Sequence, residues 1–156
     1  MQLFSDFQCP FCSRVNPTVD QILKEYGNKV KIVWRDYPLP FHKDAGPAAQ
    51  AAREVFKQGG NKKFWPYHDK LFANQKELTR ENLEKFASEI GGIDMNAFKA
   101  ALDSESHKAA VESDIAAVTK AGARIGTPSF FINGKLVQGA QPFEAFKVVI
   151  DEALKN

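Results

Sequence analysis

Cys9 and Cys12 are the residues of this chain whose type and spacing most clearly predict chemistry. They are the only two cysteines among 156 residues, and they are separated by Pro10 and Phe11. Two thiols at this spacing can close a disulfide, and the disulfide can then pass to other thiols by exchange. A bridge between residues so close in sequence closes almost no loop, so it would add little stability. The pair therefore indicates redox chemistry rather than a structural cross-link.

The main alternative is half of a zinc site, because paired cysteines at this spacing also ligate zinc. Zinc would need two further ligands, and the chain's nitrogen donors of this kind are His42, His68 and His107. None of the three histidines lies in a second paired motif, so we expect no metal. Two inert, buried cysteines are the remaining alternative.

The cysteine pair lies where a predicted strand, residues 2–7, gives way to a predicted helix from Cys9 to Tyr26, with apolar residues at helical spacing. The start of a helix carries unpaired N–H groups and the positive end of the helix dipole, which lower the pKa of a thiol there. Pro10 suits the first turn, because the N–H that proline lacks has no helical partner there. We therefore expect Cys9 to be an exposed, acidic sulfur and Cys12 to be covered by the helix.

The rest of the chain predicts a strand, a helical block, two strands and a last helix. Residues 30–37 have the pattern of the second strand, and Arg35 and Asp36 near its end are expected to form a surface ion pair. The block from about residue 43 to residue 122 predicts only helices. Asn133-Gly134, between two short apolar runs, is a strong signal for a hairpin turn.

The composition is that of an ordinary globular protein, with 44% hydrophobic and 26% charged residues. The net charge is +2 and the lysines form no basic block, so we expect no nucleic-acid partner. No apolar run approaches the length of a membrane-spanning helix. The first residues show neither the basic region nor the apolar stretch of a signal peptide, which leaves a cytoplasmic protein or a trimmed mature chain.

Residues 4–12 (FSDFQCPFC), the helical block and residues 126–134 (GTPSFFING) together resemble the DsbA-like proteins of the thioredoxin superfamily. The resemblance covers essentially the whole chain, in the same order. It implies an α/β thioredoxin fold, in which a mixed central sheet is flanked by helices, with an inserted all-helical domain. The thioredoxin-fold domain would be discontinuous, comprising residues 1–42 and 122–156, and the helical insertion would comprise residues 43–121.

The same resemblance implies roles for individual residues. Cys9 matches the nucleophilic cysteine that bonds to the substrate, and Cys12 matches the resolving cysteine. Pro128 matches a cis-proline that faces the disulfide, and Thr127 precedes it. A cis bond there would turn the Thr127 backbone toward Cys9, where an extended substrate can pair with it. The alternative is that Thr127 and Pro128 simply begin a strand.

Three residues depart from the family's pattern. The best-studied oxidases have histidine where this chain has Phe11, and phenylalanine cannot donate a hydrogen bond to a thiolate. Many members have a buried acid where this chain has Leu3. Thr127 replaces the valine of the strongest oxidases and is more similar to the isomerase and reductase branches. We expect Pro10 and Phe11 to help position the substrate. Because Phe11 replaces the histidine, we also expect a redox potential less oxidising than that of DsbA.

The resemblance implies a thiol–disulfide oxidoreductase that forms or exchanges disulfide bonds in unfolded or cysteine-containing protein substrates. We expect a monomer that needs no cofactor. The family's redox partner is a quinone-linked membrane thiol oxidase, and its compartment is the periplasm or cell envelope. A reductase or isomerase of the same fold is one alternative, and a peptide-binding or chaperone domain without redox turnover is another.

Overall fold

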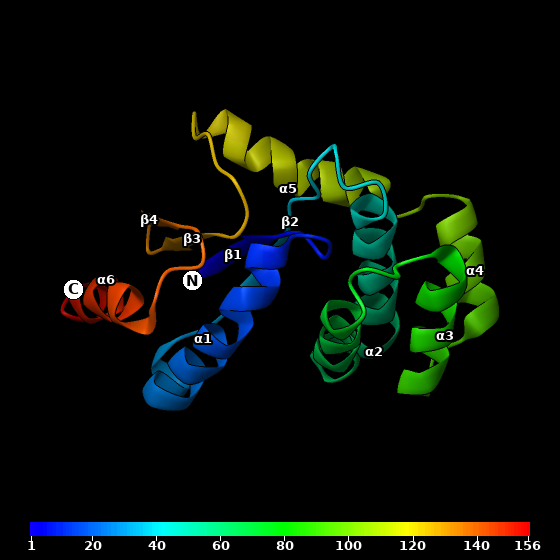
Figure 1. The fold of residues 1–156 in the computed structure, drawn as a ribbon, viewed down its shortest axis with the longest axis horizontal. Helices are drawn as coiled ribbons and strands as arrows, with labels where there is room; N and C mark the ends of the chain where they lie inside the picture. Colours follow the sequence, from blue (N-terminus) through cyan, green and yellow to red (C-terminus); the bar gives the residue numbers. More distant parts are fainter.

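The computed structural model describes residues 1–156, and its four strands form one mixed sheet in the order β2-β1-β3-β4 (Figure 1). β1 (Gln2–Ser5) pairs in parallel with β2 (Val33–Asp36) and antiparallel with β3 (Ser129–Ile132), which pairs antiparallel with β4 (Lys135–Gln138). Asn133 and Gly134 join the last two strands with φ angles of 46° and 89°. Positive φ at both positions is what a tight hairpin turn requires, so the predicted hairpin is confirmed.

Six helices complete the fold, and those of the helical block lie to one side of the sheet (Figure 1). They are α1 (Pro10–Tyr26), α2 (Ala45–Ala73), α3 (Arg80–Ile90), α4 (Met95–Asp103), α5 (Lys108–Lys120) and α6 (Phe143–Leu154), with a short 3-10 turn, η1 (Gly27–Lys29), after α1. α1 and α6 pack together, whereas α2, α3 and α4 gather to one side of the sheet and α5 crosses from them toward β2. This arrangement is the predicted thioredoxin fold with helices between its second and third strands. None of the helices is both long enough and apolar enough to cross a membrane.

The cysteine pair lies between two separate apolar clusters. One cluster joins Leu3 to the buried faces of α1, β3 and α6. The other belongs mainly to α2, α3 and α4, but it also contains Phe7, Cys9 and Cys12. The first turn of α1 therefore packs against the helical block, whereas Val15 and the later turns pack against the sheet.

The second strand is shorter than the predicted residues 30–37. β2 begins at Val33, which lies opposite Gln2, the first residue of β1. Residues 30–32 have no strand to pair with at this end of the sheet, because β1 does not extend that far. Their apolar side chains Val30 and Ile32 still pack against the cluster around Leu3.

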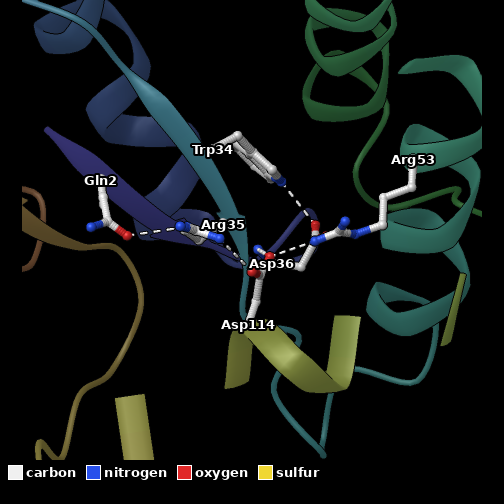
Figure 2. A network of polar contacts seen from close by, with 6 residues as sticks. All are labelled: Gln2, Trp34, Arg35, Asp36, Arg53 and Asp114. Carbon is white, nitrogen blue, oxygen red and sulfur yellow. Dashed lines mark hydrogen bonds and ion pairs between the residues drawn. The ribbon is translucent and has the colours of Figure 1, made fainter. Parts of the chain in front are cut away.

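The expected surface ion pair between Arg35 and Asp36 is wrong. Successive residues of a strand point to opposite faces, so the two side chains diverge. Asp36 is only 1% exposed and pairs with Arg53 of α2, whereas Arg35 pairs with Asp114 of α5 at 3.1 Å (Figure 2). Asp114 also accepts hydrogen bonds from Arg53 and from the backbone N–H of Asp36 (2.9 Å). These contacts join β2, α2 and α5.

Replacing Asp114 by alanine should lower the free energy of unfolding by about as much as the loss of a buried charged contact. The change leaves the Asp36 N–H without its acceptor and both arginines without one partner, so we expect a loss of about 2 kcal/mol in the free energy of unfolding. Asp103→Ala is the matched control, because its side chain is 70% exposed and pairs with Arg80 at the surface. Its loss should stay below about 0.5 kcal/mol. Urea titrations followed by circular dichroism compare the two, and equal losses would contradict a special role for the buried cluster.

Candidate active site

Cys9 occupies the position immediately before α1, with an extended backbone (φ −75°, ψ 120°). Its carbonyl accepts hydrogen bonds from the N–H groups of Cys12 (3.1 Å) and Ser13 (3.2 Å), which close the first turn. The expectation that Cys9 is exposed is wrong, because the residue is only 3% exposed. The backbone of Thr127 lies over its sulfur, with 3.4 Å between Cys9 Sγ and the Thr127 carbonyl oxygen.

The Cys9 sulfur is strongly acidic, with a pKa lowered to about 5. The largest cause is a hydrogen bond from the Cys12 thiol, and the Thr127 side chain and the backbone N–H groups of Cys12 and Phe11 act in the same direction. Burial acts against them, because it disfavours the charged form. At neutral pH the donors prevail, and the sulfur is a thiolate.

Cys12 has the opposite character. It is fully buried, and this burial raises the pKa of its thiol, as do its hydrogen bond to Cys9 and the charge of the Cys9 thiolate. The Ser5 hydroxyl and the Asp6 backbone N–H also act on this sulfur and oppose the rise in pKa. Both cysteines are free thiols in this structure. One sulfur is thus ready to attack or to leave, while its neighbour keeps its proton.

The segment before β3 approaches the pair from the other side. The peptide bond between Thr127 and Pro128 is cis. The Thr127 hydroxyl is buried with no hydrogen-bond partner, and the Thr127 side chain lowers the pKa of the Cys9 thiol. The next hydroxyl, that of Ser129, donates to the Gly126 carbonyl at 2.6 Å and holds the segment in place.

The residues between the cysteines face outward. Pro10 occupies the first turn of α1 and is exposed. Phe11 is 51% exposed, and the guanidinium of Arg14 lies 4.8 Å above the centre of its ring. Leu3, where many relatives of the family have an acid, is 2% exposed within an apolar cluster. Position 3 therefore holds no carboxylate in this chain.

Asp6 organises the loop that precedes Cys9. Its buried carboxylate accepts hydrogen bonds from the N–H groups of Gln8 (2.7 Å) and Leu39 (2.8 Å), and its Oδ2 lies 2.7 Å from Nδ1 of His42. Gln8 in turn accepts a hydrogen bond from the Asp44 N–H at 2.8 Å. The loop from residue 5 to Cys9 is therefore tied to the segment between β2 and α2.

Gln75 ties the same loop to the helical block. Its side-chain amide donates to the carbonyls of Phe7 (3.0 Å) and Cys9 (3.2 Å), on either side of Gln8. The sequence carries no signal for this contact, because a glutamine after a helix is unremarkable and the partners lie 66 and 68 residues away. Ser5 was likewise not singled out, although its place at the end of the strand before the cysteines is a signal that could have identified it.

A family model described as Thioredoxin matches residues 1–152. The chain belongs to the thioredoxin family. Among solved structures it is similar to oxidised BdbD from Bacillus subtilis, with 26% identity, a TM-score of 0.84, and coverage of 99% of this chain and 88% of that one. The thiol-disulfide exchange protein alpha-DsbA2 from Wolbachia pipientis shares the fold at a TM-score of 0.82, with 23% identity over 97% of this chain and 79% of that one. The predicted resemblance to DsbA-like thiol–disulfide oxidoreductases is confirmed.

Matches among curated proteins are to segments of much larger proteins. A Na(+)/H(+) antiporter NhaA 3 from Salinispora tropica is 33% identical over 154 residues, which are 98% of this chain and 23% of the antiporter. The chain thus spans about a quarter of the length of the curated relatives that it matches. Sodium–proton exchange is the activity named for those whole proteins.

Titration of the reduced protein should show one thiolate forming with a midpoint at the Cys9 pKa of about 5. In the unfolded chain that thiol keeps its proton up to roughly pH 8.5. The reduced protein should therefore become more stable, relative to Cys9→Ser, as the pH rises from about 5 to about 8.5, and should lose this advantage as the pH falls through 5. Thiolate absorbance and urea titrations provide the two measurements.

The Cys9→Ser variant is also the control for the titration, because its remaining thiol is Cys12, whose pKa is raised by burial. It should show no thiolate up to about pH 9. A wild-type midpoint near that of an ordinary cysteine would contradict the role assigned to the Cys12 hydrogen bond.

Proposed function

We propose that this chain forms or exchanges disulfide bonds in protein substrates through Cys9 and Cys12. The observation that carries the proposal is that the two sulfurs have pKa values shifted in opposite directions. Cys9, with a pKa near 5, receives a hydrogen bond from Cys12, whose pKa is raised. Exchange needs one sulfur that is easily attacked and leaves well, and a second that waits as the resolving group. Membership of the thioredoxin family and likeness to DsbA-like structures support the same chemistry.

In the oxidising direction the reaction begins from a Cys9–Cys12 disulfide. A substrate thiolate attacks Cys9 Sγ, a new sulfur–sulfur bond forms, and Cys12 leaves and takes a proton. A second substrate thiolate then attacks the substrate sulfur of the mixed disulfide, and Cys9 leaves as a thiolate. The substrate has lost two electrons and gained a disulfide, and the protein holds two thiols. Stabilising the Cys9 thiolate favours this direction, because a more acidic thiol is a better leaving group.

The residues around the pair would position the substrate. Beside Cys9, the backbone of Thr127, fixed by Pro128, would pair with an extended substrate segment. Phe11, half-exposed and supported by Arg14, offers an apolar ring next to the disulfide, and Pro10 fixes the first turn that carries it. An exposed ring suits unfolded chains, whose apolar side chains are accessible.

The pKa of Cys9 indicates the redox poise. The nucleophilic cysteine has a pKa of about 3.5 in DsbA and about 7 in thioredoxin. A value near 5 lies between them. One unit of pKa corresponds to about 1.4 kcal/mol, which is about 30 mV for this two-electron couple. We therefore place the chain between DsbA and thioredoxin, as an oxidase or broad oxidoreductase.

Reoxidation of the dithiol would require an oxidant of the kind the family uses, a quinone-linked membrane thiol oxidase. This partner and an extracytoplasmic compartment belong together, because disulfides persist where the surroundings are oxidising. A monomer would suffice for the reaction, since both sulfurs and the Thr127 segment come from one chain. Residues 43–121 would act as the helical insertion that steadies the cysteine loop, through Gln75.

A reductase or isomerase is the second candidate. The observation that favours it is the intermediate pKa of Cys9, since a sulfur less acidic than that of DsbA also attacks substrate disulfides well. Its signature would be recovery of activity by scrambled ribonuclease without any external oxidant. An oxidase would instead reactivate reduced ribonuclease and consume its own disulfide.

Cys12→Ser should trap a covalent complex with a protein substrate that carries a disulfide. The Cys9 thiolate attacks the substrate disulfide, one substrate sulfur leaves as a thiolate, and the mixed disulfide that forms has no Cys12 thiol to resolve it. A non-reducing gel should therefore show a new band that dithiothreitol removes. Cys9→Ser is the matched control and should form no such band, because its remaining thiol is buried. If the wild type and Cys9→Ser bind substrate equally well, and the wild type neither oxidises nor reduces it, the non-redox binding alternative is supported instead.

Phe11→His should make the protein more oxidising. Histidine can stabilise the Cys9 thiolate by a hydrogen bond or by its positive charge, and so lower the pKa of Cys9. Each unit by which that pKa falls should raise the redox potential by about 30 mV. We expect the wild-type potential to lie between about −270 and −120 mV, the values of thioredoxin and DsbA. Equilibration with glutathione buffers measures both proteins. Phe41→His, at a ring that is 76% exposed, is the control and should leave the potential unchanged; a wild-type value at or above that of DsbA would contradict the importance of Phe11.

A further inference from the structure

A cavity of about 270 Å³ lies between the outer edge of β2 and the concave side of α2. Neither cysteine lines it. The lining residues come from the segment 31–36, which includes β2, and from both halves of α2. α2 bends at Gly60, where φ is 62° and ψ is −158°, so Arg53 and Phe56 before the bend and Trp65 after it line the same space. A residue with a side chain would be strained at that φ, which makes the bend a built feature of the helix.

The walls of this cavity are aromatic. Trp34, Phe56, Phe64 and Trp65 line it, and they are the chain's two tryptophans and two of its phenylalanines. Phe64 meets the other three edge to face, at centroid distances of 5.8 Å (Trp34), 6.2 Å (Phe56) and 4.9 Å (Trp65). Both tryptophans are half-buried, and Phe56 is 49% exposed. Aromatic side chains of this kind pack favourably against a further ring in edge-to-face or offset geometry.

Three charged residues line the cavity, the cations Lys31 and Arg53 and the carboxylate Asp36. Nε and Nη2 of Arg53 bind Asp36 and Asp114, but Nη1 has no partner in the protein. Both oxygens of Asp36 are already occupied, by Trp34 Nε1 at 2.8 Å and by Arg53. Lys31, at the rim, makes no ion pair. The donors that remain free are those of Arg53 and Lys31, while the one carboxylate is satisfied.

We propose that this cavity binds a small aromatic monocarboxylate, with its ring among the tryptophans and Phe64 and its carboxylate at Arg53 Nη1 and Lys31. An unpaired guanidinium donor beside an apolar wall matches an anion carried on a ring, because the carboxylate gains charge-assisted hydrogen bonds while the ring leaves water. The volume of about 270 Å³ lies just below that of most ligand cavities, which begin at roughly 300 Å³, so the occupant has one ring.

Arg53 is held ready for this contact. Its guanidinium reaches from α2 between Asp36 of β2 and Asp114 of α5, and these two carboxylates fix its plane (Figure 2). A ligand therefore does not have to order the side chain when it binds, which removes one of the usual costs of association.

Intrinsic fluorescence tests the site, because every tryptophan of the chain lines the cavity. The probe is 3-phenylpropionate, added to the full chain with excitation where the probe does not absorb. We expect a saturable change with a dissociation constant on the order of 1 mM, as befits so small a ligand. Absence of a saturable change up to the solubility limit of the probe overturns the proposal.

The matched cation, 3-phenylpropylammonium, tests the charge. Trp65 also borders a second cavity, of about 220 Å³ between α1 and α2, whose charged lining residues include Asp20 and Asp69. A site there would favour the amine, whereas the proposed site should bind the amine at least 10-fold more weakly than the carboxylate. Equal binding of the two probes, or tighter binding of the amine, overturns the proposal.

Two substitutions locate the carboxylate. Lys31→Glu reverses the charge at the rim and should weaken 3-phenylpropionate about 10-fold, or about 1.4 kcal/mol. Lys29→Glu makes the same change two residues away, outside the lining, and should leave the affinity within about 2-fold. Both lysines are exposed, so both variants should fold as the wild type does. Equal effects of the two substitutions overturn the assignment.

A peptide arm separates a free small molecule from a chain end that carries the same groups. N-acetylglycylphenylalanine presents a ring and a carboxylate but brings an additional peptide group and acetyl cap. It should bind more weakly than 3-phenylpropionate, because the cavity holds only one ring and its acid. Equal or tighter binding of the peptide overturns the proposal of a small-molecule ligand.

Discussion

The hydrogen bond from the Cys12 thiol to the Cys9 sulfur is the contact on which the redox site depends. It needs one sulfur that stays protonated and one that gives its proton up, and the start of α1 supplies both. Cys12 is fully buried, which raises its pKa, while Cys9 is reached by backbone N–H groups of the first turn, which lower its pKa. The rest of the loop exists to hold that turn in place: Asp6 fixes one side through Leu39 and Gln75 fixes the other.

Burial of Cys9 makes the surrounding donors matter more, because they must outweigh the cost of removing a thiolate from water. In the strongest oxidases of the family a histidine stands before the second cysteine and a valine before the proline. Here the Phe11 side chain is half-exposed and has no donor, whereas the Thr127 side chain lowers the pKa of Cys9. The Cys12 thiol makes the largest contribution to the low pKa of Cys9, and the Thr127 side chain and the backbone N–H groups of Cys12 and Phe11 add to it. Together they hold the pKa near 5 without a histidine.

Features that depend on neighbouring residues could be predicted from the sequence. The apolar period after Cys9 predicts α1, and Asn133-Gly134 predicts the turn between β3 and β4, because both signals act over a few residues. Features that depend on distant residues could not. Thr127, whose carbonyl contacts the Cys9 sulfur, lies 118 residues later, and the contact of Gln75 with the cysteine loop spans more than 60 residues. Resemblance to a family brought Thr127 to the site, but nothing in the sequence pointed to Gln75.

Asp36 shows why such contacts decide what a strand residue becomes. Its neighbour Arg35 was an obvious partner by sequence, yet the pleat sends the two side chains to opposite faces. Arg53 of α2 pairs with Asp36 instead, and the arrangement joins the helical block to the edge of the sheet.

Trp34 connects this edge to the redox loop. Its Nε1–H donates to Asp36, and its ring stacks on Phe7 with centroids 4.8 Å apart, two residues before Cys9. Phe7 in turn contributes the carbonyl that Gln75 holds. A single indole therefore spans the distance from the charged cluster at α2 to the loop that carries the nucleophile. A displacement of Trp34 would shift both the charged cluster and the cysteine loop, because close-packed side chains transmit strain. Trp34 therefore both lines the aromatic cavity and packs against Phe7 of the cysteine loop, although the two sites differ in their chemistry.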